Sequence, residues 1–287
     1  MDVSVCREGN IEYPFELLGF SPHDLMRYLV TALMFVCSAQ IADAQSSSLA
    51  RADAIRIAEA FSLADHIGDE VWEGWQAAPF AILLITPKKD FLINHPYPTD
   101  DFQSEGVDEI LGMEVFSRPS GTFSPRLLAT FPAVAGVSTI VVGQAETTGK
   151  SSTMWVLTLL HEHFHQYQSA WPDYYSGVNA LDLSGGDQTG MWMLNYPFPY
   201  EEGDVVEALY QVRDETLTVL SSEDKSASLK DLAGALENLK ANVSEKDFRY
   251  LSFQLWQEGI SRYTEEVVAK MASGGYNATE AFAELGM

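Results

Sequence analysis

A run of three histidines and one glutamate lies within positions 161–165, where the sequence reads HEHFH. Four residues turn through about 400° on an α-helix, so His161 and His165 point in nearly the same direction and can share one metal ion. Glu162 lies at the edge of that pair, where a carboxylate can take a proton from water. His163 lies roughly 200° around the helix from His161, so we expect it to be packed or hydrogen-bonded behind the pair. The run therefore predicts a metal site with a general base beside it.

The flanking residues predict the helix that this geometry needs. Residues 153–168 contain no Pro or Gly, Ser151 and its neighbours are good N-cap residues, and Trp171-Pro172 follows the run. Histidines on a helix can also be ordinary surface or core residues. That interpretation does not account for a glutamate placed next to the first of two histidines that are four positions apart, so the metal site is favoured.

Two histidines leave a catalytic zinc site incomplete, because such a site takes three protein ligands and one open position. The pattern H-E-x-x-H-x-x-G-x-x-H is excluded, since this chain has Gln168 and Trp171 where the pattern has Gly and His. No histidine follows His165, so a downstream third ligand must be an acid. The candidates are Glu201, Glu202, Asp204, Glu207, Asp214, Glu215, Glu258, Glu265 and Glu266.

Glu258 stands apart from the other acids because it lies in apolar surroundings within a long amphipathic helix, expected over 244–272. Gly259 follows it, and glycine inside a helix costs about 1 kcal/mol relative to alanine. We therefore expect a close approach of two helices at Gly259, which would bring Glu258 to the histidines.

The H-E-x-x-H run and the later segment W-x-E-G-x-x-x-Y-x-E at 256–265 together resemble the gluzincin metallopeptidases, in particular the aminopeptidase N-like branch. The resemblance covers two helices and implies a zincin-like fold, bound Zn²⁺ and Glu258 as the third ligand. It also implies that Glu162 activates water for hydrolysis of a peptide bond. The 258 − 165 = 93 positions between the last histidine and Glu258 require additional helices between them. The segment 112–115 departs from the substrate-binding G-x-M-E-N pattern of that branch, so specific aminopeptidase activity is not implied.

The first 44 residues have the features of an export signal. From Met26, one basic residue precedes an apolar run at 28–36, and Ala42-Asp43-Ala44 provides the small residues of a cleavage site. The apolar run is shorter than the about 20 residues that a membrane span needs. We therefore expect a presequence over 1–44, cleaved after Ala44, and a secreted or periplasmic protein without stable membrane insertion. A short amphipathic helix of a cytosolic protein is the alternative.

Composition excludes several classes of partner. The 287 residues include 41 acids and 17 Lys or Arg residues, giving a formal net charge of −24. Such a charge repels nucleic acid and anionic membranes, so we expect neither as a partner. The peptide or protein substrate that we expect follows from the resemblance to metallopeptidases. Both cysteines, Cys6 and Cys37, lie in the presequence, so we expect no cysteine chemistry. Nothing in the sequence indicates the oligomeric state.

Hydrophobic patterns predict an α+β fold, and the resemblance implies one zincin-like domain over 45–287. A helix and a small, mostly antiparallel sheet would occupy 45–150, and a helical region carrying both ligand helices would occupy 151–287. We expect a helix over 45–77, strands at 80–86 and 91–94 around a turn, a strand at 137–143, and helices at 203–221, 228–241 and 244–272. The strand at 137–143 is either an edge that binds an extended substrate or an interior strand. The aromatic-rich loop 171–200 is expected to form pocket walls.

These observations predict an exported zinc-dependent metallopeptidase in which His161, His165 and Glu258 bind Zn²⁺ and Glu162 is the general base. Candidate donors to the substrate's oxyanion are Arg262, Tyr250 and Tyr263. One alternative is a zinc hydrolase of a non-peptide amide. The other is an inactive zincin-fold binding protein, against which the presence of Glu162 argues.

Overall fold

The computed structural model describes residues 48–187, 190–223 and 225–286. The signal peptide predicted within residues 1–44 lies outside these residues. Among the described helices, none combines the length and the apolar character that a membrane span requires.

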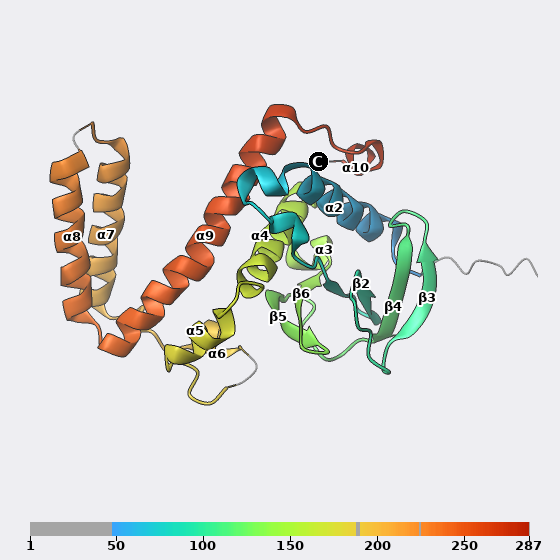
Figure 1. Ribbon diagram of the computed structural model, residues 1–287, viewed down its shortest axis with the longest axis horizontal. Helices are drawn as coiled ribbons and strands as arrows, with labels where there is room; N and C mark the ends of the chain where they lie inside the picture. The colour runs from blue at the N-terminus through green and yellow to red at the C-terminus, as the bar shows by residue number, and fades with distance from the viewer. Residues whose placement is uncertain (1–47, 188–189, 224, 287) are drawn as a thin grey trace, which may run out of the picture. The chain divides into compact units, whose positions relative to one another are not determined.

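Six strands form one mixed sheet with the order β3-β4-β2-β1-β6-β5 (Figure 1). They are β1 Ile82–Ile85, β2 Lys89–Ile93, β3 Gln103–Asp108, β4 Met113–Pro119, β5 Leu128–Val134 and β6 Val137–Gly143. The β1–β6 pair is parallel, whereas the other four pairs are antiparallel. The predicted α+β class and mostly antiparallel sheet are confirmed, as are β1, β2 and β6, while β3, β4 and β5 were not predicted.

Strand β6 lies inside the sheet, between β1 and β5. Its residues from Thr139 to Gly143 are buried, because both neighbours and both faces of the sheet cover them. The prediction that 137–143 forms a substrate-binding edge is therefore wrong, and the alternative, an interior strand, is correct. Among the described strands, β5 is the edge on this side of the sheet.

One face of the sheet packs against helices α2 (Arg51–Val71) and α4 (Ser152–Ser169). Alternate strand residues such as Ile82, Leu84 and Ile140 point into this core, as the two-residue period of a strand requires. The intervening residues, including Leu83 and Val141, form a second cluster on the other face. The short helices near this core are α3 (Ala145–Thr148) and the 3₁₀ turn at Trp75–Ala77.

Helix α9 (Glu245–Gly275) packs along α4 and α2. Its N-cap residue, Ser244, accepts a hydrogen bond from the backbone N–H of Asp247, which stabilises the first turn. Between α4 and α9 the chain forms α5 (Tyr174–Ala180), α6 (Trp192–Asn195), α7 (Gly203–Ser221) and α8 (Lys225–Asn242), and α10 (Glu280–Glu284) follows α9. The helices expected at 203–221, 228–241 and 244–272 are thus confirmed within three residues at each end, whereas the helix expected over 45–77 is shorter, because α2 ends at Val71.

Candidate metal centre

Helix α4 is fixed to the sheet at both ends. The indole Nε1 of Trp155 donates to the carbonyl of Gly143 at 2.8 Å, at the end of β6. Near the C-terminal end of the helix, the Gln166 side chain donates to the carbonyl oxygens of Ala81 and Ser138, both at 2.9 Å. These buried contacts hold the histidine run at a defined height and rotation relative to the sheet.

His161, His165 and Glu258 lie together, as the sequence predicts. The Nε2 atoms of the two histidines are 3.2 Å apart. Oε2 of Glu258 lies 3.5 Å from Nε2 of His161, and Oε1 of Glu258 lies 3.5 Å from Nε2 of His165. Both histidines are buried, whereas about half of the Glu258 side chain is exposed. This group could hold a metal ion.

Gly259 does not have the role that we expected of it. A Cβ atom added at Gly259 would meet nothing within 4 Å, so this glycine marks no close approach of two helices. Helix α9 contacts α4 through Gln257 and Ser261, which are buried. Glu258 reaches the histidines because it lies beside that contact face.

The carboxylates around His161 favour a positive charge at this position. Burial disfavours the protonated ring, but the contacts with Glu258 and Glu265 outweigh it and raise the pKa of His161 to about 9. Burial likewise opposes ionisation of Glu258, but the two histidines outweigh it and lower the pKa of that carboxyl below its usual range.

Glu265 lies on the Nδ1 side of the His161 ring, with Oε2 3.2 Å from Nδ1. The contact is close, but its geometry is not that of a hydrogen bond. The same carboxylate accepts from Nη1 of Arg262 at 2.6 Å. A carboxylate beside the second nitrogen of a histidine ligand orients the ring and strengthens its metal bond. Glu265 is thus a partner of His161 rather than a member of the three-residue group.

The imidazole of His165 has three polar neighbours at Nδ1. They are Gln168 Oε1 at 2.8 Å, Gln257 Nε2 at 3.0 Å and Ser261 Oγ at 3.2 Å. Two of them come from α9, so the same helix that supplies Glu258 also fixes the second histidine.

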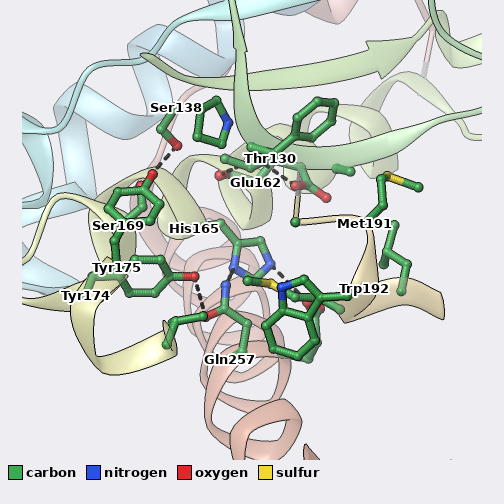
Figure 2. A pocket seen from close by; sticks show the side chains of 18 of the residues that line it. Thr130, Ser138, Glu162, His165, Ser169, Tyr174, Tyr175, Met191, Trp192 and Gln257 are labelled. Atoms are coloured by element: carbon green, nitrogen blue, oxygen red, sulfur yellow. Dashed lines mark hydrogen bonds and ion pairs between the residues drawn. The ribbon is translucent and has the colours of Figure 1, made fainter. Parts of the chain in front are cut away.

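The Glu162 side chain contacts strand β5. Its Oε2 atom accepts a hydrogen bond from Thr130 Oγ1 at 2.8 Å (Figure 2). Glu162, His165 and Glu258 all line one cavity of about 300 Å³. The candidate base and two of the candidate ligands therefore line the same cavity.

The rest of the cavity wall comes from two segments. Residues 128–132 of the edge strand β5 form one side, and the loop and short helices between α4 and α7 form the other. The second side includes Tyr174, Tyr175, Met191 and Trp192 (Figure 2). The prediction that the aromatic-rich loop 171–200 forms pocket walls is confirmed.

None of the three predicted oxyanion donors lines this cavity. The hydroxyl of Tyr250 donates to the carbonyl of Met193, Tyr263 is 60% exposed, and Arg262 contacts Glu265. These residues are close to Glu258 in sequence and lie on the same helix, but their side chains project from other faces of α9 than the one that lines the cavity. Tyr174 lines the cavity and was not singled out from the sequence, although it lies in the aromatic-rich loop that was expected to form pocket walls.

His163 lies behind the site, as expected from its rotation around the helix. Its ring stacks on Phe80, with centroids 3.9 Å apart, and on Trp75 at 5.6 Å. Burial lowers the pKa of His163 to about 4, although a hydrogen bond with Gln166 opposes the shift. His163 is therefore a neutral core residue on the far side of α4.

Comparison with known protein families, with curated proteins and with solved structures found no match to this chain.

Proposed function

We propose that this chain is a zinc-dependent metallopeptidase of the zincin type, with Zn²⁺ held by His161, His165 and Glu258. The observation that carries the proposal is the meeting of two histidine Nε2 atoms with the carboxylate of Glu258, which lies 93 positions after His165 (258 − 165). Of this group, His165 and Glu258 line a cavity that Glu162 also lines. The features of residues 26–44 support export of the protein.

The spacing of the donor atoms fits a tetrahedral ion. With metal–nitrogen bonds of about 2.0–2.1 Å, two nitrogens on a tetrahedral ion lie roughly 3.3 Å apart. The observed separation of the two nitrogens is 3.2 Å, and each nitrogen lies 3.5 Å from a different oxygen of the Glu258 carboxylate. Two imidazoles and one carboxylate are also the donor set of many catalytic zinc sites, which keep a fourth position open.

When bound, Zn²⁺ would lower the pKa of a water molecule toward about 7 and polarise the substrate's carbonyl group. Glu162 would accept the proton from that water and pass it to the leaving amine. The hydroxyl of Thr130 donates to one oxygen of the Glu162 carboxylate, which leaves the other oxygen for the water. The buried position of Glu162 excludes bulk solvent from this transfer.

An extended peptide is the substrate that the cavity wall favours. Strand β5 is paired only with β6 among the described strands, and its residues 128–132 line the cavity. An unpaired strand edge can bind an extended peptide through backbone hydrogen bonds. A small non-peptide amide would make no use of this edge.

The test measures zinc content and hydrolysis of a labelled unstructured protein such as casein. We expect one zinc per chain in the wild type and in Glu162→Gln, with hydrolysis about 10²–10⁴-fold slower in the variant. Glu266→Gln is the control, since Glu266 is an exposed acid on α9 and should leave the rate unchanged. A wild type without zinc, or an equally active Glu162→Gln, would show that the proposal is wrong. Zinc binding with hydrolysis of small amides alone would favour the non-peptide hydrolase, and zinc binding without hydrolysis would favour the binding protein.

A further inference from the structure

Helices α7 and α8 pack side by side as an antiparallel hairpin (Figure 1). Val205 and Ala208 of α7 and Leu239 of α8 are buried in one cluster. On one side of the hairpin, the side-chain nitrogen of Asn238 donates to the side-chain oxygen of Gln211 at 3.1 Å. This hydrogen bond marks one face of the hairpin and shows which residues of the two helices lie level.

The opposite face of the hairpin is apolar and exposed. Leu220 follows Gln211 by nine residues and Leu229 precedes Asn238 by nine, which is about 180° around each helix. Leu220 and Leu229 therefore lie level with each other, on the side away from the hydrogen bond. Four leucines of this region, 37% to 70% exposed, make up what we call the leucine face: Leu217, Leu220, Leu229 and Leu236.

Charged residues are divided between the two faces. Five acids lie within about 60° of Gln211 or Asn238 around their helices: Asp204, Glu207, Asp214, Glu215 and Asp231. Three exposed bases lie about 140–160° from the same two residues, on the leucine face: Arg213, Lys225 and Lys240. Lys230 and Glu237 lie between the two faces. The leucine face is thus locally positive, although the chain as a whole is strongly acidic.

Exposed leucines flanked by bases fit a surface that is apolar inside and negative outside. A layer of anionic lipids has this arrangement, since leucines can enter the acyl boundary while Lys and Arg side chains extend to the phosphates. The two helices offer an area about 27 Å long and about 20 Å wide, from their rise per residue and their diameter. The leucines of both helices can therefore meet one lipid surface together.

A second copy of this chain fits the leucine face less well. Pairing two such faces would bring the bases of both copies together, where they repel each other. The acids of the hairpin oppose lipid binding less strongly, because they lie on the far side of helices about 10 Å across, and physiological salt screens charges over about 8 Å.

We propose that the leucine face of the α7–α8 hairpin binds the surface of anionic lipid membranes, with both helices lying in the plane of the headgroups. This binding is peripheral and involves no membrane span. It is independent of the metal site and of peptide hydrolysis. The net charge of −24 predicts repulsion from such membranes, whereas the distribution of charge on the hairpin favours contact at this one face.

Flotation with lipid vesicles tests the proposal on the full chain. One set of vesicles contains phosphatidylcholine with about 30% phosphatidylserine, and the other contains phosphatidylcholine alone. We expect binding to the anionic vesicles, about 10-fold less binding to the neutral ones, and release by about 0.5 M NaCl.

Two variants with the same added charge locate the binding face. Leu229→Glu should lower binding to anionic vesicles about 10-fold, because it places a carboxylate among the leucines. Ala227→Glu is the matched control, since Ala227 is exposed and lies about 20° from Asn238 around α8, on the acidic face. It should bind as the wild type does. Both variants contain residues 1–44, so their difference excludes any lipid binding by that segment, and circular dichroism checks that both are folded.

Three results would overturn the inference. They are a wild type that does not bind anionic vesicles, wild-type binding by Leu229→Glu, and an equal loss of binding in both variants. Sedimentation velocity without lipid tests the rival partner. A wild-type dimer that Leu229→Glu dissociates and Ala227→Glu does not would assign the face to a second copy and would also overturn lipid binding. None of these results bears on zinc content or hydrolysis, so the proposed function is tested separately.

Discussion

Thr130 on strand β5 and Glu162 on helix α4 share one hydroxyl proton. Thr130 Oγ1 lies 2.8 Å from the Glu162 carboxylate and 3.0 Å from the backbone carbonyl of the same residue. Both acceptors belong to the residue that we assign as general base, whereas the donor belongs to the edge of the sheet. The orientation of the base is thus set by the strand that forms one wall of the cavity.

Replacing Thr130 tests this relationship. We expect Thr130→Val to lower kcat about 10–100-fold, because the Glu162 carboxylate loses the hydroxyl that orients it, with zinc content unchanged. Thr130→Ser retains the hydroxyl and should retain most of the activity. Steady-state kinetics with zinc analysis of each variant checks the prediction, and equal activity in Thr130→Val would contradict it.

Three glutamate-to-alanine variants rank the carboxylates around the histidines. Loss of the ligand in Glu258→Ala should weaken zinc binding by more than about 100-fold. Glu265→Ala should weaken it about 10–100-fold, since Glu265 contacts Nδ1 of His161. This expectation for Glu265 comes from its contact with His161 in the structure and not from the sequence. Glu207→Ala, at an exposed position of α7, is the control. Competition with a chromophoric chelator gives the three affinities, and equal values for Glu258→Ala and Glu207→Ala would exclude Glu258 as a ligand.

His163 should matter for stability and not for the metal. Its ring fills the space between Phe80 and Trp75 and is 2% exposed. We expect His163→Ala to lower the free energy of unfolding by about 2–4 kcal/mol through the cavity it leaves. His163→Phe should cost less, because it keeps an aromatic ring in the stack. Urea denaturation with a chelator present measures both, and a large loss of zinc affinity in folded His163→Phe would contradict the assignment.

Acid should weaken an ion pair in the sheet. Burial opposes ionisation of Glu105, but Lys89 and Ser117 outweigh it and lower the pKa of Glu105 to about 2, from 4.5. A carboxyl with a lowered pKa stabilises the folded state above its usual pKa, and this stabilisation is lost as the pH falls from about 4.5 to about 2. At pH 7, we expect the wild type to be more stable than Glu105→Gln by about 1–3 kcal/mol. Chemical denaturation from pH 7 to pH 2.5 should show the difference shrinking, and a constant difference would contradict the assignment to this carboxyl.

The residues of helix α4 could be predicted because their signal is local. The N-cap, the absence of Pro and Gly, and the four-residue spacing of His161 and His165 all act within one helix. Strands β3 and β5 carry no such signal. Gly106 and Pro132 lie inside them, and register shifts occur near both residues. These strands form because a neighbouring strand pairs with them, and local propensity does not show that pairing.

The contact between α4 and α9 could be predicted only in part. Glu258 was identified from its surroundings and from a resemblance, but Gly259 was wrongly taken as the contact point. The buried face of α9 at the site carries Gln257, Ser261 and Thr264, which are polar and follow the helical period. A search for apolar periodicity overlooks such a face, because its side chains are buried to form hydrogen bonds rather than to exclude water.

Pro132 has a further consequence for a protein with an open sheet edge. An edge that can take a peptide can also take the edge of another copy, and repeated pairing of this kind leads to aggregation. Pro132 has no N–H to offer, and the register shift between Phe131 and Val134 distorts the strand just there. Only the short stretch 128–131 is left with regular pairing geometry. If β5 binds a short substrate chain as we propose, the distorted register at Pro132 would oppose repeated pairing with further copies.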